Sequence, residues 1–465
     1  MKAHHRVEFL GGAGTVTGSM HLLHSGTQRV LLDCGLLQGL KPLRLRNWSE
    51  RVADPAGLDA VVLSHAHLDH TGYLPRLVAA GFRGPVYCTA ATEDLLNIML
   101  PDAAHLQEEQ AEHANFIGFA KHKPALPLYT TADALAALDR LLPRPYGTEF
   151  EVAEGVRATF RRAGHILGSA TVDLALDGKR PSRLVFSGDL GRPHQPILRG
   201  PEAVPQADVL LLESTYGNRR HAGDAAEELA NIVAETARRG GVLLIPAFAV
   251  GRTQSVIWLL RRLEEEGRIP ALPTYVDSPM AIDATEIYLR HPEDHDLVME
   301  KLLDRGHHPL QTRQFRLART RDESRALNDL SGPFIIVSAS GMATGGRVLH
   351  HLKLRLPEPR TTVLLVGFQA AGTRGRALQE GAKTVRILGA EVAVRARVET
   401  LDGLSAHADQ QEMLDWLGQM TRAPRQVWLV HGEEENAGAF AEMIRKRLGW
   451  NVDVAQDRAT VPVDA

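Results

Sequence analysis

The sequence predicts an α/β protein in which a β-rich domain is interrupted by a second domain of alternating helices and strands. Short apolar runs with glycine-rich turns fill residues 1–190 and return near residue 395, which indicates layers of short strands. From about residue 216, helical stretches alternate with buried apolar runs, which is typical of a parallel α/β sheet. We therefore predict three segments, 1–215, 216–396 and 397–465, of which the middle one is an insertion.

The elements follow from the hydrophobic pattern of each segment. In the first segment the predicted strands are residues 29–35, 59–64, 171–176 and 183–187, and the predicted helices are residues 92–100 and 131–142. In the insertion the predicted helices are residues 225–239 and 253–266, and the predicted strands are residues 241–246, 334–337 and 362–366. The last segment contains the apolar run 426–432, followed by a terminal helix.

The composition is that of an ordinary globular protein. Hydrophobic residues make up 44% of the 465 residues, charged residues make up 23%, and the formal net charge is −3. Cys34 and Cys88 form no CxxC pair, so neither a disulfide framework nor a cysteine-rich zinc site is indicated. No apolar run approaches the roughly 20 residues that span a bilayer, and the first residues lack the apolar core of a signal peptide. We expect a cytoplasmic protein without a membrane partner.

The charge is distributed unevenly along the chain. Residues 301–400 carry 17 Lys and Arg against 8 Asp and Glu, whereas the rest of the chain carries 36 against 48. A basic block in an acidic protein predicts a local surface for a polyanion. The alternative is a chance cluster on a solvated face.

The strongest local signal is the hexapeptide HAHLDH at residues 65–70, which follows an apolar run. Imidazole and carboxylate groups are typical zinc ligands. His65 and His67 point the same way in extended backbone, whereas Asp69 and His70 are adjacent and both reach inward only if the chain turns. We therefore predict a strand-to-helix loop that binds metal, most simply at a dinuclear site. A histidine-rich loop without metal is the alternative.

Three more candidate ligands follow apolar runs elsewhere in the chain. His165, Asp189 and His431 each lie next to glycine after a predicted strand. Taken singly, each is better explained as a core or turn residue. As a set, they predict that several strand ends meet at one edge of a folded sheet.

With Asp33 before it and His165 and Asp189 after it, the hexapeptide resembles the metallo-β-lactamase fold of metallohydrolases. The resemblance implies an αββα sandwich with metals at the sheet edge. It implies that a first metal is bound by His65, His67, His165 and Asp189. A second metal would be bound by Asp69, His70, His431 and again Asp189. Asp33 would fix the ligand loop from behind, as outer carboxylates commonly do.

Three further motifs refine the resemblance. Glu213 lies in LESTY, His407 in LSAHAD and His431 in LVHG, and the predicted insertion lies between Glu213 and His407. These motifs resemble those of the β-CASP nucleases, in the branch that acts on RNA. That branch includes the endonuclease subunit of the pre-mRNA cleavage and polyadenylation machinery and its bacterial and archaeal relatives.

The resemblance implies a metal-dependent ribonuclease that leaves 5′-phosphate and 3′-hydroxyl ends. We expect two Zn²⁺ per chain, with Mn²⁺ as the alternative. His407 is the expected general acid and Glu213 the residue that holds it; a structural histidine is the alternative for His407. Asp69 is counted with these catalytic residues as well as with the ligands. The endonuclease versus 5′-exonuclease balance, the RNA target and the oligomeric state stay open, and a homodimer is one option.

Candidate RNA-binding residues lie in the insertion. Ser338, Ser340 and Gly341 belong to a glycine-rich stretch between a strand and a helix, where backbone N–H groups suit a phosphate. A turn that needs glycine for its geometry is an equal alternative. Arg374 and Arg376 are further candidates for contacts with the RNA backbone. The alternative is that they are ordinary solvated arginines. Since an inserted domain next to a metal site predicts a cleft, we expect single-stranded RNA as the substrate.

Two other functions compete with this prediction. A small-molecule metallohydrolase, such as a thioesterase or a lactamase, needs neither the insertion nor the Glu213 and His407 motifs. A non-catalytic RNA-binding scaffold would be expected to lack metal ligands, but every expected ligand is present.

Overall fold

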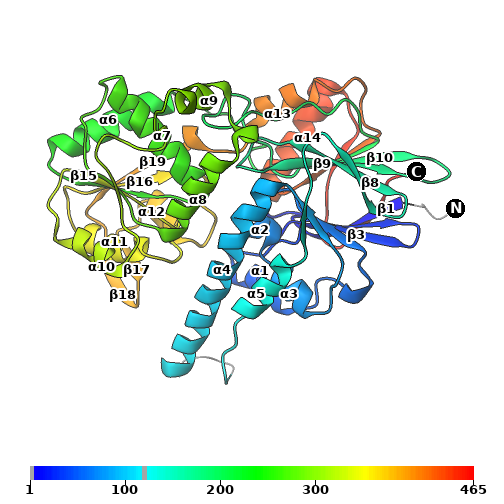
Figure 1. The fold of residues 1–465 in the computed structure, drawn as a ribbon, viewed down its shortest axis with the longest axis horizontal. Helices are drawn as coiled ribbons and strands as arrows, with labels where there is room; N and C mark the ends of the chain where they lie inside the picture. The colour runs from blue at the N-terminus through cyan, green and yellow to red at the C-terminus, as the bar shows by residue number, and fades with distance from the viewer. Residues whose placement is uncertain (1–4, 118–122, 222, 465) are drawn as a thin grey trace. The chain divides into compact units, whose positions relative to one another are not determined.

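The structure is a computed structural model that describes residues 5–117, 123–221 and 223–464. Figure 1 shows the path of the chain. It divides into two compact units. Unit 1 comprises Met1–Pro193, Gly200–Arg220 and His407–Ala465, and unit 2 comprises His194–Arg199 and His221–Ala406. The predicted α/β class is confirmed, and the chain of unit 1 is interrupted by that of unit 2.

Unit 1 contains two mixed sheets. The first has the order β22-β1-β2-β3-β4-β5-β6 and the second the order β21-β20-β11-β10-β9-β8-β7. The strands of the first sheet are β1 His5–Gly11, β2 Met20–Ser25, β3 Gln28–Leu32, β4 Ala60–Val62, β5 Val86–Cys88, β6 Leu141–Pro143 and β22 Thr460–Pro462. Those of the second are β7 Glu149–Ala153, β8 Val156–Arg162, β9 Ala170–Leu176, β10 Ser182–Phe186, β11 Val209–Glu213, β20 Gln426–Val430 and β21 Val452–Val454.

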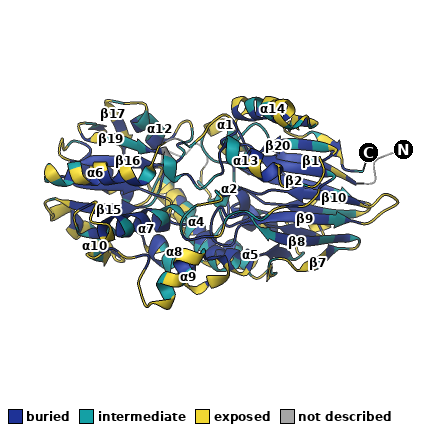
Figure 2. Ribbon diagram, turned by 90° about the horizontal axis from the view of Figure 1, so that it is seen from above, coloured by how far each residue is buried: buried dark blue, intermediate teal, exposed yellow. Residues whose placement is uncertain are grey.

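The two sheets of unit 1 share one apolar core. Val30, Leu32 and Val62 of the first sheet cluster with Val172 and Leu211 of the second. Because side chains alternate across a strand, Leu31 and Val61 face the opposite side of the first sheet, where they are also fully buried. The dark-blue strands of Figure 2 show this burial in both sheets.

Helices cover the outer faces of the sheets. They are α1 Lys41–Leu45, α2 Leu68–Thr71, α3 Leu74–Ala79, α4 Ala90–Ile117, α5 Thr131–Leu138, α13 Gln410–Leu417 and α14 Glu434–Leu448. Trp416 of α13 and Phe440 of α14 pack on Leu210 and Leu212 of β11. The result is the expected αββα sandwich.

Two local predictions in unit 1 need correction. The helix expected after the HAHLDH hexapeptide already begins within it, at Leu68. Asp69 and His70 therefore lie on the first turn of α2 rather than in a loop. A tight helical turn is what lets adjacent residues both reach one site. The predicted helix 131–142 is too long, because α5 ends at Leu138 and residues 141–143 pair with β5 in the sheet.

Unit 2 is a mainly parallel sheet with helices. The sheet has the order β14-β13-β15-β12-β16-β19, and β17 pairs with β18 as a separate ribbon. The strands are β12 Val242–Pro246, β13 Thr274–Val276, β14 Phe315–Leu317, β15 Phe334–Ser338, β16 Thr362–Val366, β17 Thr384–Ile387, β18 Ala390–Ala393 and β19 Arg397–Leu401. The helices are α6 Ala225–Arg238, α7 Arg252–Glu265, α8 Pro279–Arg290, α9 Leu297–Asp304, α10 Arg321–Ala326, α11 Val348–Arg355 and α12 Arg374–Gln379.

The pairing of β19 bears on the C-terminal boundary of the predicted insertion. The predicted boundary at 396/397 lies just before β19, which pairs in parallel with β16 of unit 2. The structure divides the chain into two compact units, and the boundaries of the three predicted segments stay a prediction. Within the described ranges, none of the helices combines the length and apolar character that a membrane span needs.

Candidate metal centre

Parallel strands of unit 1 carry the predicted ligands to the ends of the sheets. Asp33 follows β3 and His65 follows β4, and these strands are parallel neighbours. Asp189 follows β10, Glu213 ends β11 and His431 follows β20, again along parallel neighbours. Because parallel strands end at the same sheet edge, residues far apart in sequence become neighbours. Asp33 and His431 have positive φ angles of 57° and 47°, a conformation that non-glycine residues adopt mainly where the surroundings enforce it.

The first ligand set is His65, His67, His165 and Asp189, whose ligand atoms all lie within 4.8 Å of one another. His67 Nδ1 lies 3.1 Å from His65 Nε2 and 3.3 Å from His165 Nε2. Asp189 Oδ2 lies 3.6 Å from His65 Nε2 and 3.6 Å from His165 Nε2. Ligands of tetrahedral zinc, with bonds of about 2.0–2.1 Å, are separated by roughly 3.3 Å. The separations of these four atoms are therefore close to those of the ligands around a tetrahedral zinc ion.

The second ligand set is Asp69, His70 and His431. His431 Nε2 lies 3.0 Å from His70 Nε2 and 3.4 Å from Asp69 Oδ2. The other oxygen of Asp189, Oδ1, lies 3.3 Å from His70 Nε2. It is buried and accepts no hydrogen bond from the described residues. One carboxylate thus faces both sets, one oxygen to each, as a bridging ligand would.

The protonation of two imidazoles fits metal binding, whereas for His70 burial is outweighed by the charges and hydrogen bonds of Asp189 and Asp33, which raise its pKa well above its usual value. Burial, with the charge of His70, holds the pKa of His65 well below its usual value, and burial lowers the pKa of His67 to about 4. These imidazoles are therefore neutral and offer lone pairs. Burial would raise the pKa of Asp189, but the charges of His431, His70 and His65 hold it well below its usual value. A buried carboxylate among imidazoles is a set of donors suited to zinc.

Asp33 fixes the ligand loop from behind, which is the role that the sequence predicted. Its Oδ2 lies 2.6 Å from His70 Nδ1, and its Oδ1 accepts a hydrogen bond from the Ser64 amide at 2.8 Å. The hydroxyls of Ser19 and Ser64 donate to Oδ2, each at 3.0 Å. Since one nitrogen of His70 binds Asp33, the other is directed at the ligand set.

His407 and Glu213 form a pair beside the ligands. Glu213 Oε1 lies 3.1 Å from His407 Nδ1 and also accepts a hydrogen bond from the Leu190 amide. His407 Nδ1 lies 3.9 Å from Asp189 Oδ2. Burial alone would lower the pKa of His407, but the charge and hydrogen bond of Glu213 raise it above its usual value. The pair is therefore arranged to keep a protonated imidazole next to the metal ligands.

The sequence interpretation missed several supporting residues. Besides Ser19 and Ser64, Thr215 lies 3.2 Å from His431 Nδ1 through its hydroxyl, which also donates to the His431 carbonyl. Ser64 directly precedes the hexapeptide, and Thr215 lies in the Glu213 motif, so their position in the chain was a usable signal. For Ser19, only the pairing of β2 with β3 reveals the contact.

Comparison with known proteins agrees with this geometry. Residues 28–245 match the beta-lactamase superfamily domain, residues 253–378 the Beta-Casp domain, and residues 391–455 the Zn-dependent metallo-hydrolase RNA specificity domain. Ribonuclease TTHA0252 of Thermus thermophilus is 39% identical over 98% of this chain and 100% of its own length. The chain belongs to the β-CASP family of metallo-β-lactamase proteins. The family resemblance drawn from the sequence is thereby confirmed.

Other relatives of this β-CASP protein carry a different name. Transcription termination factor FttA of Methanocaldococcus jannaschii is 32% identical over 95% of this chain and 69% of its own length. FttA of Methanosarcina mazei has the same identity and coverage. A crystal structure of a protein of unknown function from Enterococcus faecalis V583 superposes with a TM-score of 0.50 and 13% identity, over 98% of this chain and 99% of that one. This last likeness concerns the fold alone.

The predicted RNA-binding residues of this β-CASP protein lie in unit 2. Ser338 ends β15, is buried, and donates its hydroxyl to the Asp277 carbonyl. The hydroxyl of Ser340 accepts a hydrogen bond from the Thr344 amide. Arg374 donates to the carbonyls of Ala343 and Thr344, so it stabilises the loop itself. Arg376 pairs with Glu380. Their role in RNA binding stays a prediction.

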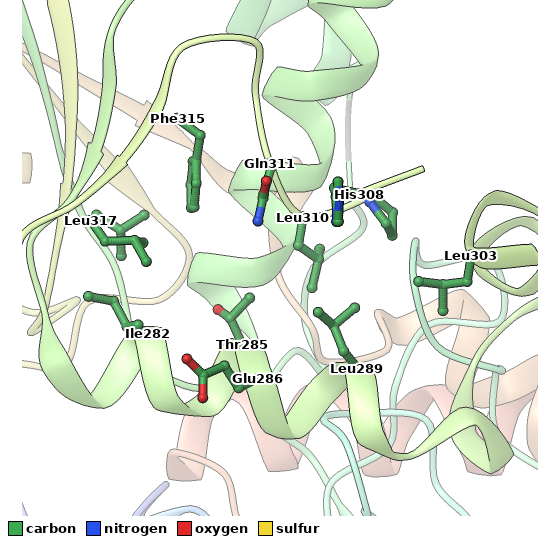
Figure 3. A pocket seen from close by; sticks show the side chains of 12 residues that line it. Ile282, Thr285, Glu286, Leu289, Leu303, His308, Leu310, Gln311, Phe315 and Leu317 are labelled. Carbon is green, nitrogen blue, oxygen red and sulfur yellow. The ribbon is translucent and has the colours of Figure 1, made fainter. Parts of the chain in front are cut away.

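Unit 2 also contains a separate cavity of about 120 Å³, shown in Figure 3. Its lining is mostly apolar, with Ile282 and Leu289 of α8 facing Phe315 and Leu317. The hydroxyl of Thr285 is engaged with Ala281 and Gln254, and Glu286 is paired with Arg319. The residues that line the cavity include His308 but no Lys, no Arg and none of the predicted site residues.

Proposed function

We propose that this chain is a zinc-dependent endoribonuclease that hydrolyses single-stranded RNA at a dinuclear centre and leaves 5′-phosphate and 3′-hydroxyl ends. The main support for this proposal is that Asp189 faces both ligand sets and lies beside the His407–Glu213 pair. This arrangement provides two metal positions and a proton donor at one point. The names of the matching domains and of the ribonuclease relative support RNA as the substrate.

The ligand assignment keeps the division expected from the sequence. His65, His67, His165 and Asp189 would hold one zinc ion, and Asp69, His70, His431 and Asp189 the other. When bound, a zinc pair supplies a water with a pKa near 7 and positive charge for the phosphate oxygens. All of these side chains come from unit 1 of a single chain, so a second subunit is not needed to complete the set. A homodimer and a cytoplasmic location stay predictions.

His407 is the proposed general acid. Its Nδ1 is held by Glu213, and its Nε2 is the proposed donor to the departing ribose 3′-oxygen. Glu213 is fully buried and also accepts a hydrogen bond from the Thr215 amide, so it cannot rotate away without losing backbone partners. A fixed carboxylate both orients the imidazole and stabilises its charged form.

The glycine-rich loop of unit 2 is the proposed RNA phosphate contact. The carbonyls of its residues 341–344 accept hydrogen bonds from Gln369, Gly375 and Arg374. The backbone N–H groups of Gly341, Met342, Gly345 and Gly346 have no acceptor among the described residues. A loop with occupied carbonyls and available amides suits an anion. Ser340 and Arg374 shape this loop, and Arg376 is the most peripheral of the proposed contacts.

A substrate comparison tests the function. Zinc-loaded protein is incubated with single-stranded RNA, with blunt duplex RNA of the same sequence, and with nitrocefin and a thioester. We expect cleavage of the single strand, weak cleavage of the duplex and no turnover of the small molecules. Turnover of a small molecule without RNA cleavage would favour a thioesterase or lactamase activity. Binding of RNA without cleavage at any metal loading would favour a scaffold.

A further inference from the structure

The loop between β1 and β2, residues 12–18, contacts the candidate metal centre through its backbone. The amide of His431 donates a hydrogen bond of 2.6 Å to the Gly12 carbonyl. His431 has a positive φ of 47°, a conformation that a non-glycine residue adopts mainly where its surroundings enforce it. The hydrogen bond to Gly12 is one of the contacts that hold this backbone. The loop and one expected ligand of the second metal are therefore mechanically joined.

One buried cation binds three carbonyl groups at this loop. A single arginine, Arg51, lies beneath it with only 1% of its surface exposed. One nitrogen of its guanidinium donates to the Gly18 carbonyl at 2.8 Å and, more weakly, to the Leu10 carbonyl at 3.4 Å. The other terminal nitrogen donates to the Gly35 carbonyl. One of these three carbonyls, that of Gly18, belongs to the loop, so the buried cation anchors the loop at its end.

Several amide groups of the same loop have no acceptor in the described part of the chain. Among the described residues, none accepts a hydrogen bond from the backbone N–H groups of Ala13, Gly14, Thr15 or Val16. These residues are half-buried rather than fully enclosed. Gly12 and Gly14 have φ angles of 66° and 67°, and such left-handed residues within a tight loop turn successive N–H groups toward one concave side.

An oxyanion already approaches this loop. Glu434, in the first turn of α14, places a carboxylate oxygen 3.4 Å from the point where a Cβ on Gly14 would stand. No hydrogen bond joins this carboxylate to the loop amides among the described contacts. Glu434 is exposed, so its side chain can leave when a stronger anion arrives.

We propose that the backbone amides of residues 13–16 bind a phosphate group of the RNA chain next to the scissile bond. The proposal rests on the proposed function, because it places a second phosphate beside the metal centre. Successive N–H groups that face one concave side suit an anion such as a phosphate. The Arg51 cation behind the loop adds a favourable potential, and both of its terminal nitrogens are hydrogen-bonded to carbonyls.

Two pairs of variants test the charge at this loop. Glu434→Gln removes the competing carboxylate, and we expect KM for RNA to fall about two- to five-fold, as is typical of an exposed charge contact. Glu435→Gln, at the neighbouring exposed position of the same helical turn, is the matched control and should leave KM unchanged. Thr15→Asp adds a carboxylate to the loop and should raise KM more than Thr15→Asn does, with kcat and zinc content little altered.

The RNA side of the contact is tested with neutral phosphates. A series of RNAs, each with one methylphosphonate, is cleaved by the wild-type protein and by Thr15→Asp. We expect one position near the scissile bond at which neutralisation raises KM for the wild type but not for Thr15→Asp, since each change removes the same contact. If every position affects both proteins equally, or if Glu434→Gln and Glu435→Gln behave alike, the inference is wrong. The wild type would then still cleave RNA, so failure of the proposed function remains distinguishable.

Discussion

A single residue, Asp189, organises the chemistry of this protein. Its two oxygens face different ligand sets, and His407 lies 3.9 Å from one of them. The resemblance to the metallo-β-lactamase fold named candidate ligands, and the structure brings these side chains together; that they bind metal stays a prediction. The resemblance also implied that Asp189 belongs to both sets, but which oxygen faces which set depends on the rotation of one carboxylate and could not be predicted. The roles of Ser19 and Thr215 also escaped, since a hydroxyl that supports a ligand has no distinctive sequence pattern.

The first residue-scale prediction concerns the general acid. In His407→Ala we expect kcat for RNA to fall by about 10²–10⁴-fold, the usual contribution of a positioned acid. Zinc content, measured by atomic emission, should be unchanged because His407 is outside both ligand sets. Wild-type kcat with full zinc occupancy would show that His407 is only structural.

The second residue-scale prediction concerns pH. Since Glu213 raises the pKa of His407, Glu213→Gln should lower it. An acid must be protonated, so activity falls as pH rises through this pKa, and the fall should begin at lower pH in the variant. The kcat–pH profile, recorded only with zinc-replete protein, measures the shift. A descending limb at the same pH in both proteins would contradict the assignment.

At the scale of elements, close backbone contacts hold the metal-binding turn in place. The amides of Ser19 and Cys34 donate to the carbonyls of Asp69 and His70. Strand positions were predictable because apolar runs of this length have few alternatives. The start of α2 within the hexapeptide and the end of α5 were not, because β-pairing and loop contacts, rather than local propensity, decide them.

Gly35 tests this packing. A Cβ at this position would lie only 1.7 Å from the Asp69 carbonyl oxygen, so the ligand turn must move in Gly35→Ala. We expect the free energy of unfolding to fall by about 1–3 kcal/mol, and we expect fewer zinc ions per chain, since Asp69 and His70 are proposed ligands. Gly438→Ala, in α14 with nothing within 4 Å of the added atom, is the matched control. Equal stability and zinc content in the two variants would contradict the packing argument.

At the scale of the whole molecule, each unit has its own apolar core, and all expected metal ligands belong to unit 1. Metal removal should therefore destabilise unit 1 selectively, because a ligand stabilises only the part that binds it. Hydrogen exchange before and after chelation should show lost protection near the ends of β4, β10 and β20, with β12, β15 and β16 unaffected. Uniform loss in both units would contradict this.

Metal-dependent hydrolysis of RNA by this protein can be measured with end-labelled RNA. Single-stranded RNA labelled at the 5′ or the 3′ end is incubated with the zinc-loaded protein, with the chelated protein, and with chelated protein given zinc again. We predict internal fragments with 5′-phosphate and 3′-hydroxyl ends, no cleavage after chelation, and recovery with zinc. Cleavage that survives chelation, or fragments ending in 2′,3′-cyclic phosphate, would contradict the account.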